Sequence, residues 1–481
     1  MKGAFIFYGL SRILAFFTVG ALLITALSLY SETGVTVCFL PTLALAGIGS
    51  CLCYGPGKAR RQQMRLSEGA VLLTGSWVVL ALLGALPFII SHRLSVVDGI
   101  LDSVSAVTTN GLFLLSHEEA GIFKDWHILL EWMGAFIFIN LFVTVMPQIS
   151  KVFSIGLSDD NPFAFTPGIR RMNSYLKPVS VTFVVITLLS ITAFTMAGLP
   201  LHTAVLQALT TVSTGGTTVE HLGNRTVVWA CVFSMFLAGC NFLLLYRVTS
   251  ERTLRPLWRN TEIRVFLAVL LGAALLLSMN VHDRAGFEWN ESLRLSVFYV
   301  LSFLTTTGFT GTNLALFPDF DKLLLFILTF VGGCVGSVTG GMKIIRFLIL
   351  FKMSSQELLR TLHPQMVISV KANGVFVSLP VINRALNVFF LFIGLFFLSI
   401  LILAPAGLSP LEALGLAGAG LTGTGATAAL FGLGDVGSLP VWAKAYYCIL
   451  MIWGRVEVVA FLLVVQTTMH FFKHRWQEFF V

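Results

Sequence analysis

The chain contains four short runs of hydroxyl-bearing residues that each end in glycine, and each run follows a short apolar stretch. They are Thr108-Thr109-Asn110-Gly111, Ser213-Thr214-Gly215-Gly216, Thr305-Thr306-Thr307-Gly308 and Thr422-Gly423-Thr424-Gly425. Any one of these runs alone is most simply an ordinary glycine turn. Four copies between long apolar segments instead indicate one structural unit that is repeated four times along the chain.

Each unit is predicted to be a short helix followed by an extended loop. Thirteen residues before the final glycines stand Asp98, Thr203, Leu295 and Glu412, so three of the four positions are polar, as expected near a helix N-terminus. The apolar stretches have about a dozen residues, whereas crossing a membrane takes about 20. We therefore expect the short helices to enter the membrane and return, with loops that are surrounded by protein or water at membrane depth.

The loops have the chemistry of a cation site. A dehydrated cation needs closely spaced oxygen dipoles, and backbone carbonyl groups supply them where the chain can turn its carbonyls inward. Glycine permits the necessary backbone conformations, and Thr or Ser hydroxyl groups add oxygens or brace the loop. One loop would form a weak site, but four loops around a common axis would form a selectivity filter, for which all the residues of the four runs are candidates.

Composition places the chain in a membrane. Of its 481 residues, 56% are hydrophobic and only 11% are charged, whereas soluble domains carry about 25% charged residues. The net charge of +8 comes from short basic clusters between apolar runs, which fits the excess of Lys and Arg in cytoplasmic loops better than it fits nucleic-acid binding. The seven cysteines are dispersed, so we expect no disulfide framework and no structural metal.

The predicted fold is an all-α integral membrane protein, with ten spanning helices and four re-entrant helices around a central pseudo-fourfold pore. The predicted units are an N-terminal hairpin over residues 1–66 and pore repeats over 67–160, 161–256, 257–372 and 373–481. Every basic loop, including the region from Lys343 and Arg346 onward, then falls on one side, which places both termini in the cytoplasm.

Most acidic residues are predicted to lie outside, where Asp98, Asp102 and Asp321 among others would concentrate cations at the mouth of the pore. No ionisable pair within the predicted spans stands out as a proton relay, which favours channel-like conduction. The choice between a channel and proton- or sodium-coupled transport stays open.

A span is predicted after each pore loop, at 227–246 after the second loop and at 322–350 after the third. A cluster of glycines and small polar residues interrupts the span at 322–350. Its members are Gly332, Gly333, Gly336, Ser337, Thr339, Gly340 and Gly341. Each glycine costs roughly 1 kcal/mol in a helix relative to alanine, so the cluster should break the span. Close helix packing through small residues is the alternative. We favour an unwound loop below the filter, which can obstruct ions and move aside.

A charged residue, Arg455, lies within the last predicted span at 442–468. An arginine at membrane depth is costly unless it faces water or a partner, and Arg455 is too far from either end of the span to reach a headgroup. We expect it to face the pathway below the filter, as an electrostatic barrier or as a latch on the glycine loop. Glu457, two residues further on, points elsewhere, and its partner cannot be read from the sequence.

These motifs resemble the Trk/Ktr/HKT superfamily of potassium transporters, most closely its bacterial TrkH type, over nearly the whole chain. The matching segments are Thr305-Thr306-Thr307-Gly308-Phe309-Thr310, Gly332-Gly333-Cys334-Val335-Gly336-Ser337 with Gly340-Gly341-Met342-Lys343, Leu362-His363-Pro364 and Gly454-Arg455-Val456-Glu457. The resemblance implies that four loops of one subunit line one potassium pathway and that the glycine cluster is its gate. It also links potassium preference to the final glycines Gly111, Gly216, Gly308 and Gly425.

The chain departs from the family pattern in three places. Asn110 stands where threonine is usual, and the fourth loop reads T-G-T-G rather than a run with asparagine. The third departure is Glu131-Trp132-Met133-Gly134-Ala135, where a second glycine pair is common.

The predicted function is potassium uptake across the bacterial inner membrane by a multi-pass protein among membrane lipids. The resemblance alone implies a homodimer and a cytosolic nucleotide-binding regulatory ring. The chain has no nucleotide-binding motif of its own, so any control by ATP or NAD must come from another chain. We expect no cofactor in the chain beyond potassium as substrate, and no nucleic-acid partner. A sodium or weakly selective cation transporter of the same fold remains open. A membrane enzyme is disfavoured, because the acids are scattered without DxxD-type pairing.

Overall fold

The computed structural model describes residues 4–30, 34–58, 66–149, 169–216, 223–310, 317–363, 365, 370–373 and 375–456. These residues form helices apart from loops, two short 3-10 turns and one two-stranded antiparallel ribbon. The ribbon pairs β1 (Lys371–Ala372) with β2 (Val375–Phe376), and the 3-10 turns are Ala404–Ala406 and Val436–Ser438. The prediction of an all-α fold is confirmed.

Long and short helices follow one another along the chain. The chain begins with α1 (Ala4–Tyr30), α2 (Thr36–Lys58), α3 (Leu66–Ile90), α4 (Val96–Thr108) and α5 (His117–Ile149). It continues with α7 (Ile169–Met196), α8 (Leu201–Ser213), α9 (Arg225–Gly239), α10 (Phe242–Glu251), α11 (Arg255–Arg259), α12 (Thr261–Ala285) and α13 (Trp289–Leu304). It ends with α14 (Asp319–Val331), α15 (Ile344–Leu362), α16 (Leu379–Leu403), α17 (Pro410–Thr422), α18 (Ala426–Leu430) and α19 (Val441–Val456).

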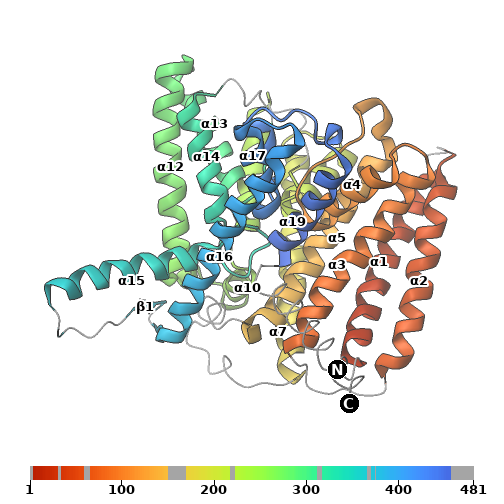
Figure 1. Cartoon of the computed structure of the whole chain (residues 1–481), viewed down its shortest axis with the longest axis horizontal. Helices are drawn as coiled ribbons and strands as arrows, with labels where there is room; N and C mark the ends of the chain where they lie inside the picture. Colours follow the sequence, from red (N-terminus) through yellow and green to blue (C-terminus); the bar gives the residue numbers. More distant parts are fainter. Residues whose placement is uncertain are drawn as a thin grey trace.

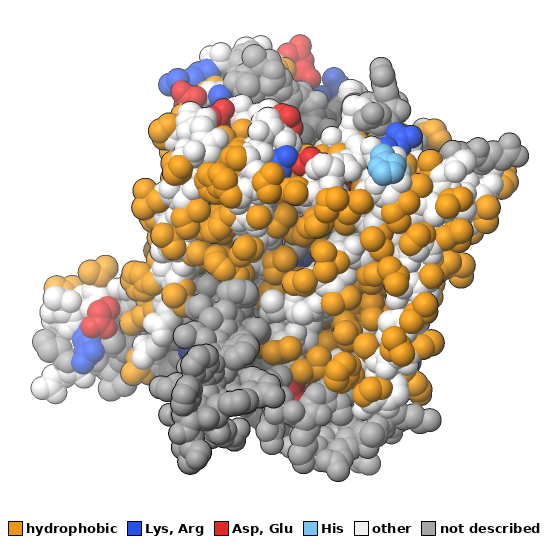
Figure 2. All heavy atoms as spheres, turned by 45° about the vertical axis from the view of Figure 1, so that its right-hand side comes forward, with side chains coloured by type: hydrophobic (Ala, Val, Ile, Leu, Met, Phe, Trp, Pro, Cys, Tyr) orange, Lys and Arg blue, Asp and Glu red, His pale blue; other side chains and the backbone are white. Residues whose placement is uncertain are grey.

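The surface and the helix lengths are those of a membrane protein. Within the described ranges, six helices are long and apolar enough to cross a membrane, or seven if the bent pair α9 and α10 forms one span. Figure 2 shows hydrophobic side chains over a broad band of the surface, with charged side chains gathered at the top and on the lobe at the lower left. Such a band faces lipid, because helices satisfy their own backbone hydrogen bonds and can expose apolar side chains there.

The leading helices α1 and α2 lie side by side at one edge of the molecule (Figure 1), as the sequence predicts. They pack on the following helices through aromatic rings. The Trp126 ring on α5 meets Phe17 of α1 at 5.8 Å and Phe39 of α2 at 5.9 Å, both edge to face. The Trp126 indole N–H also donates to the Gly84 carbonyl at 3.0 Å, so one residue joins the hairpin to α3 and α5.

The span predicted at 227–246 is wrong as a single helix. It consists of α9 and α10, which meet at an angle of 100°. The Asn241 side chain accepts hydrogen bonds from two backbone N–H groups in the first turn of α10 and so caps the second helix. Gly239 lies close to the third Thr/Gly loop, since a Cβ there would be 2.8 Å from the Thr305 methyl carbon. The backbone on both sides of the bend is bonded to residues 332–343, since the Cys334 N–H donates to the Gly239 carbonyl and the Phe242 N–H donates to the Gly336 carbonyl, both at 3.0 Å.

The span predicted at 322–350 is interrupted, as its glycines indicate. Residues 332–343 separate α14 from α15 and contain no helix. Gly332, Gly336 and Gly341 have φ angles of 69°, 76° and 70°, in the left-handed region that glycine adopts most readily. After the break the chain changes direction, and α15 extends sideways from the bundle in Figure 1.

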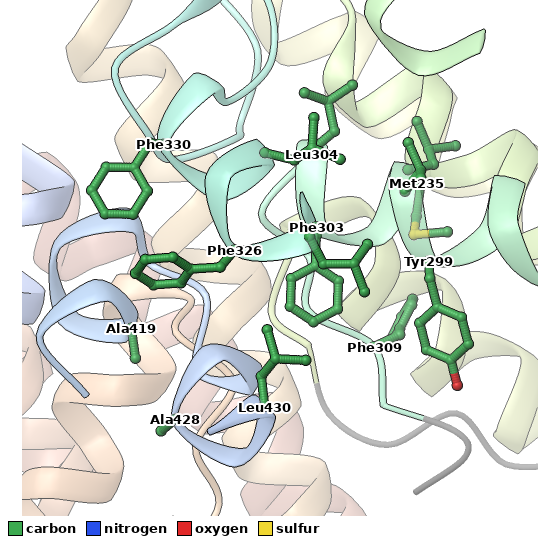
Figure 3. Packing of buried hydrophobic residues seen from close by; sticks show 14 of the residues in the cluster. Met235, Tyr299, Phe303, Leu304, Phe309, Phe326, Phe330, Ala419, Ala428 and Leu430 are labelled. Atoms are coloured by element: carbon green, nitrogen blue, oxygen red, sulfur yellow. The ribbon is translucent and has the colours of Figure 1, made fainter. Parts of the chain in front are cut away.

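Aromatic packing fixes α17 against α14. Figure 3 shows Phe326 and Phe330 of α14 near Ala419 of α17. The Phe326 ring lies edge to face with Phe330 and with Phe431, at 5.1 Å in both cases. Gly418 makes room for this ring, because a Cβ there would be 2.5 Å from a Phe326 ring carbon. The fourth short helix is thus held by a dense core.

Candidate functional site

Four short helices, α4, α8, α13 and α17, end at the four Thr/Gly runs and are 13 to 16 residues long. The Ser95 hydroxyl caps α4, and Ser409 forms a capping box with Glu412 on α17. Each helix directs its C-terminus, the negative end of its dipole, toward a loop. This orientation favours a cation among the loops.

The second residue of every run adopts a left-handed backbone conformation. The φ angle is 56° at Thr109, 59° at Thr214, 57° at Thr306 and 72° at Gly423. The final glycine also has a positive φ in the first three runs, whereas Gly425 has a φ of −55° and precedes the short helix α18. The four runs share their first turn, but the fourth loop differs at its last residue.

The first three loops contact one another through their backbones. A Cβ built on Gly111 would lie 1.8 Å from the carbonyl oxygen of Gly215 in the second loop. A Cβ on Gly216 would lie 2.1 Å from the carbonyl oxygen of Thr307 in the third loop. Both positions require glycine, because no side chain fits between the two backbones.

The fourth loop closes the circle. A Cβ on Gly308 in the third loop would lie 3.0 Å from the Thr424 methyl carbon in the fourth. The Gly425 N–H then donates to the carbonyl oxygen of Asn110 in the first loop at 2.7 Å. The structure thus brings all four runs into one closed ring of contacts, which we call the filter ring.

Asn110 braces the seam between the first and fourth loops with its side chain. Its Nδ2 donates to the carbonyl oxygen of Ala419, near the end of α17, at 2.8 Å. Its Oδ1 accepts from the Tyr447 hydroxyl of α19 at 3.0 Å. A threonine at this position could not reach both groups at once, so the departure from the family pattern has a structural role.

Most hydroxyl groups of the four runs fall into two sets, apart from Thr306, which accepts from the Gly340 N–H, and Thr307, which bonds the Thr305 hydroxyl. The first residue of every run donates to a carbonyl of the preceding helix at 2.7 to 3.0 Å; these residues are Thr108, Ser213, Thr305 and Thr422. The hydroxyls of Thr109, Thr214 and Thr424 are buried, and within the described ranges they have no hydrogen-bond partner. Buried orphan oxygens are costly, and these three are the side-chain oxygens available to a dehydrated cation.

The glycine loop lies directly against the filter ring. The Gly340 N–H donates to the Thr306 hydroxyl at 2.7 Å, and a Cβ on Gly340 would lie 2.0 Å from the Thr422 carbonyl oxygen. Inside the loop, the Ser337 and Thr339 hydroxyls are 2.8 Å apart. The loop therefore touches the third and fourth filter loops at once. That it gates the pathway stays a prediction.

Arg455 on α19 holds the glycine loop. Its Nη1 donates to the Val338 carbonyl oxygen at 2.9 Å, and its guanidinium lies 4.0 Å from the centre of the Phe138 ring. The side chain is buried, and its Nε and Nη2 have no partner among the residues that the structure describes. The contact with the glycine loop is compatible with a latch, and the choice between a latch and an electrostatic barrier stays a prediction. Glu457 lies outside the described residues.

Lys343 and Arg346, which begin a region predicted to be cytoplasmic, pack against the glycine loop, and the side of the membrane on which they lie stays a prediction. Both are buried. The Lys343 ammonium group contacts the Thr339 carbonyl and donates to its hydroxyl at 2.9 Å, and Arg346 donates to the Met342 carbonyl at 3.1 Å. Their charges fold back onto the glycine loop, where the broken helix leaves carbonyl groups without their intrahelical donors. Both residues directly follow the glycine loop in the sequence, and this position could have indicated that they contact it.

Two acids predicted at the outer mouth are also buried. Asp321 accepts from the Asn280 side chain at 2.8 Å. Asp102 accepts from the backbone N–H of Leu114 at 2.9 Å and contacts His127 Nδ1 at 2.8 Å. The span predicted at 126–149 therefore contains a buried ionisable pair, and that no such pair relays protons stays a prediction. The signal was present in α5, where His127 and Glu131 are four residues apart and share a helix face.

These features define a class: a multi-pass α-helical membrane protein with four short helices whose C-terminal loops touch in a closed ring. Residues 45–470 match the sequence model of the TrkH family, described as cation transport protein. The chain belongs to this family, and it is a transport protein rather than the membrane enzyme that the sequence left open.

Relatives and a solved structure agree with this assignment. The chain is 28% identical over 453 residues to the Trk system potassium uptake protein TrkG of Escherichia coli K12, which covers 90% of this chain and 92% of the relative. It is 31% identical over 352 residues to TrkH of Salmonella typhimurium, covering 68% and 70%. The crystal structure of the potassium transporter TrkH from Vibrio parahaemolyticus superposes with a TM-score of 0.87 at 25% identity, covering 96% and 98%.

Proposed function

We propose that this chain carries potassium into the cell through the filter ring. The relatives TrkG and TrkH are named potassium uptake proteins, and the matching crystal structure is that of a potassium transporter. The observation on this chain that supports the proposal is the closed ring itself, in which the four loops touch through their backbones at three seams and through the Thr424 side chain at the fourth. Carbonyl and hydroxyl oxygens held at such spacing can replace the water shell of a dehydrated cation.

In this proposal the filter consists of the four runs from Thr108 to Gly111, Ser213 to Gly216, Thr305 to Gly308 and Thr422 to Gly425. Potassium enters from outside, loses water among these oxygens, and meets the glycine loop on the inner side. The gate is formed by Gly332, Gly333, Gly336, Ser337, Thr339, Gly340, Gly341 and Arg455. Contacts of the loop with Thr306 and Thr422 support this order, because a loop in contact with the ring must move before an ion can pass.

The rest of the proposal follows from the family resemblance. The N-terminal hairpin and the four pore repeats lie in the bacterial inner membrane with both termini in the cytoplasm. Two copies form a homodimer, and a cytosolic nucleotide-binding ring of the Trk regulatory type controls uptake. Potassium is the substrate, and the chain carries no cofactor of its own.

The second candidate is a weakly selective pathway for monovalent cations. It is favoured by the fourth loop, in which Gly425 lacks the positive φ of the other final glycines. In such a ring the fourth loop does not place its carbonyl oxygens in the same way as the other three loops.

Flux into liposomes that contain the purified protein separates the candidates. Uptake of K⁺, Rb⁺ and Na⁺ is measured under an imposed voltage, with protein-free liposomes as the control. We expect K⁺ and Rb⁺ to enter about tenfold faster than Na⁺ or more, which corresponds to roughly 1.4 kcal/mol of discrimination. Equal entry of Na⁺ would establish the second candidate, and no entry of any monovalent cation would refute both. Conduction driven by voltage without an ion gradient would identify a channel.

A further inference from the structure

A buried polar cluster lies behind the first two loops of the filter ring. It consists of Asp102 on α4, His127 and Glu131 on α5, and Thr210 on α8. The three ionisable side chains are 0% exposed. Ionisable groups are almost never buried to this extent unless they are paired, because desolvation is costly. The proposed filter mechanism uses none of them.

The cluster is a continuous chain of contacts between two short helices. His127 Nδ1 lies 2.8 Å from Asp102 Oδ2, and its Nε2 lies 3.3 Å from Glu131 Oε1. The Thr210 hydroxyl donates to Glu131 Oε2 at 2.8 Å. Among the described residues neither His127 Nε2 nor Glu131 Oε1 has a hydrogen-bond partner, so these two atoms form a close polar contact, and the hydrogen bonds of the cluster are those of Asp102 with His127 and of Thr210 with Glu131. The chain of contacts connects α4 to α8 through α5.

Glu131 touches the filter ring itself. A Cβ on Gly215 would lie 2.0 Å from Glu131 Oε2 and 2.5 Å from Oε1, so the carboxylate is directly behind Gly215. On its other side, the Gly215 carbonyl faces Gly111 of the first loop. The Gly215 N–H donates to the Thr210 carbonyl at 2.9 Å. Gly215 has no side chain of its own, so its orientation depends on Glu131, Thr210 and Gly111.

Asp102 extends the same support to the first loop. Its Oδ1 accepts from the N–H of Leu114, which follows the first run, while its Oδ2 contacts His127. A metal site does not explain the cluster, since the described part of the chain holds no group of three or more His, Cys, Asp or Glu side chains arranged for a metal ion. The cluster therefore acts on the backbone of the ring.

We propose that Glu131 is a positioning residue that determines ion specificity. Its carboxylate, held by His127 and Thr210, fixes the direction of the Gly215 carbonyl and the width of the seam to Gly111. Selection between K⁺ and Na⁺ depends on oxygen positions, because the smaller ion gains most when the oxygens can close around it. The inference rests on the proposed function, since it presumes that the ring conducts and selects cations.

The experiment compares variants of the purified full-length protein in liposomes. Glu131→Ala should lower the ratio of K⁺ to Na⁺ flux about tenfold, because it removes the acceptor of the Thr210 hydroxyl and the support behind Gly215. Glu131→Gln should stay within about twofold of the wild type, since its amide oxygen accepts from Thr210 and its amide N–H donates to His127. Thr210→Val should lower the ratio in the same direction as Glu131→Ala.

Asp321→Ala is the matched control. It also removes a buried carboxylate that accepts a hydrogen bond, here from Asn280. It should lower thermal stability and leave the flux ratio unchanged, which separates a general loss of packing from a change in the filter.

A wild-type ratio in Glu131→Ala, or an equal loss in Glu131→Gln, would overturn the positioning role. If Glu131→Ala does not fold, a wild-type ratio in Thr210→Val overturns the role instead. If the wild-type protein itself does not distinguish K⁺ from Na⁺, the proposed function is refuted. Failure of the proposed function can thus be distinguished from failure of the positioning role of Glu131.

Discussion

Replacing Gly111 with alanine tests the filter ring most directly. The new Cβ would lie 1.8 Å from the Gly215 carbonyl oxygen, whereas carbon and oxygen atoms normally approach no closer than about 3.3 Å. The seam between the first and second loops must then open by roughly 1.5 Å. The residue also keeps a φ of 83°, which alanine tolerates poorly.

The energetic cost has two parts. A left-handed backbone costs a residue with a Cβ about 1–2 kcal/mol, and overpacking adds about 1–3 kcal/mol. Gly308→Ala shares the first part, because its φ is 72°. Its Cβ, however, would meet the Thr424 methyl carbon at 3.0 Å, and a side chain can shift more easily than a backbone carbonyl. The second part should therefore be about 1 kcal/mol or less at Gly308.

The assay is the ratio of K⁺ to Na⁺ flux in liposomes, measured together with the thermal unfolding midpoint. We expect Gly111→Ala to lower the ratio about tenfold or more and Gly308→Ala to lower it about threefold at most. Gly423→Ala is the matched control, because Gly423 has a φ of 72° and no atom within 4 Å of its Cβ position. Gly423→Ala therefore has the free-energy cost of a left-handed alanine but no steric overlap with a neighbouring loop. The reasoning would be refuted if Gly308→Ala lowered the flux ratio as much as Gly111→Ala does. It would also be refuted if Gly111→Ala kept the wild-type flux ratio.

Three further predictions follow from single contacts. Gly423→Thr should keep the flux ratio within about twofold, because the equivalent residues Thr109, Thr214 and Thr306 already adopt this backbone; a clear loss would contradict the shared first turn. Arg455→Ala removes the donor to the Val338 carbonyl and should raise the maximal uptake rate about tenfold with the ratio unchanged, so an unchanged or lower rate argues against a latch. Lys444→Met breaks the 2.6 Å pair with Asp98 and should cost about 1 kcal/mol in thermal unfolding. Asp98→Asn should match Lys444→Met, and additive losses in the double variant would show that the pair is not coupled.

The sequence predicted local structure well where local chemistry decides it. The short helices and their turns follow from an apolar stretch and a hydroxyl run with glycine, with a side-chain N-cap hydrogen bond only on α4 and α17 among the four, and α13 begins at Trp289, before the predicted start at Leu295. The broken helix at 332–343 follows from glycine, which destabilises a helix wherever it occurs. The apolar surface follows from composition.

The sequence failed where a residue's environment is made by distant segments. Asp102 and Asp321 look like mouth residues because each stands near the start of an apolar helix, but other helices cover both of them. The bend between α9 and α10 was missed because 227–246 is apolar throughout, and the backbone at the bend is hydrogen-bonded to the distant glycine loop, from Cys334 N–H to the Gly239 carbonyl and from Phe242 N–H to the Gly336 carbonyl. Burial and bending are set by packing, which hydropathy along one segment does not contain.

The sequence alone determined that the chain is helical, crosses a membrane, and carries four equivalent Thr/Gly loops, because these properties reside in composition and short-range pattern. Only the tertiary structure decided that the loops close into a ring, since the closing contacts join residues as far apart as Asn110 and Ala419, which are 309 positions apart. It alone placed Glu131 behind Gly215 and Arg455 on the glycine loop. A side chain's partners depend on the three-dimensional path of the whole chain, and no local pattern records that path.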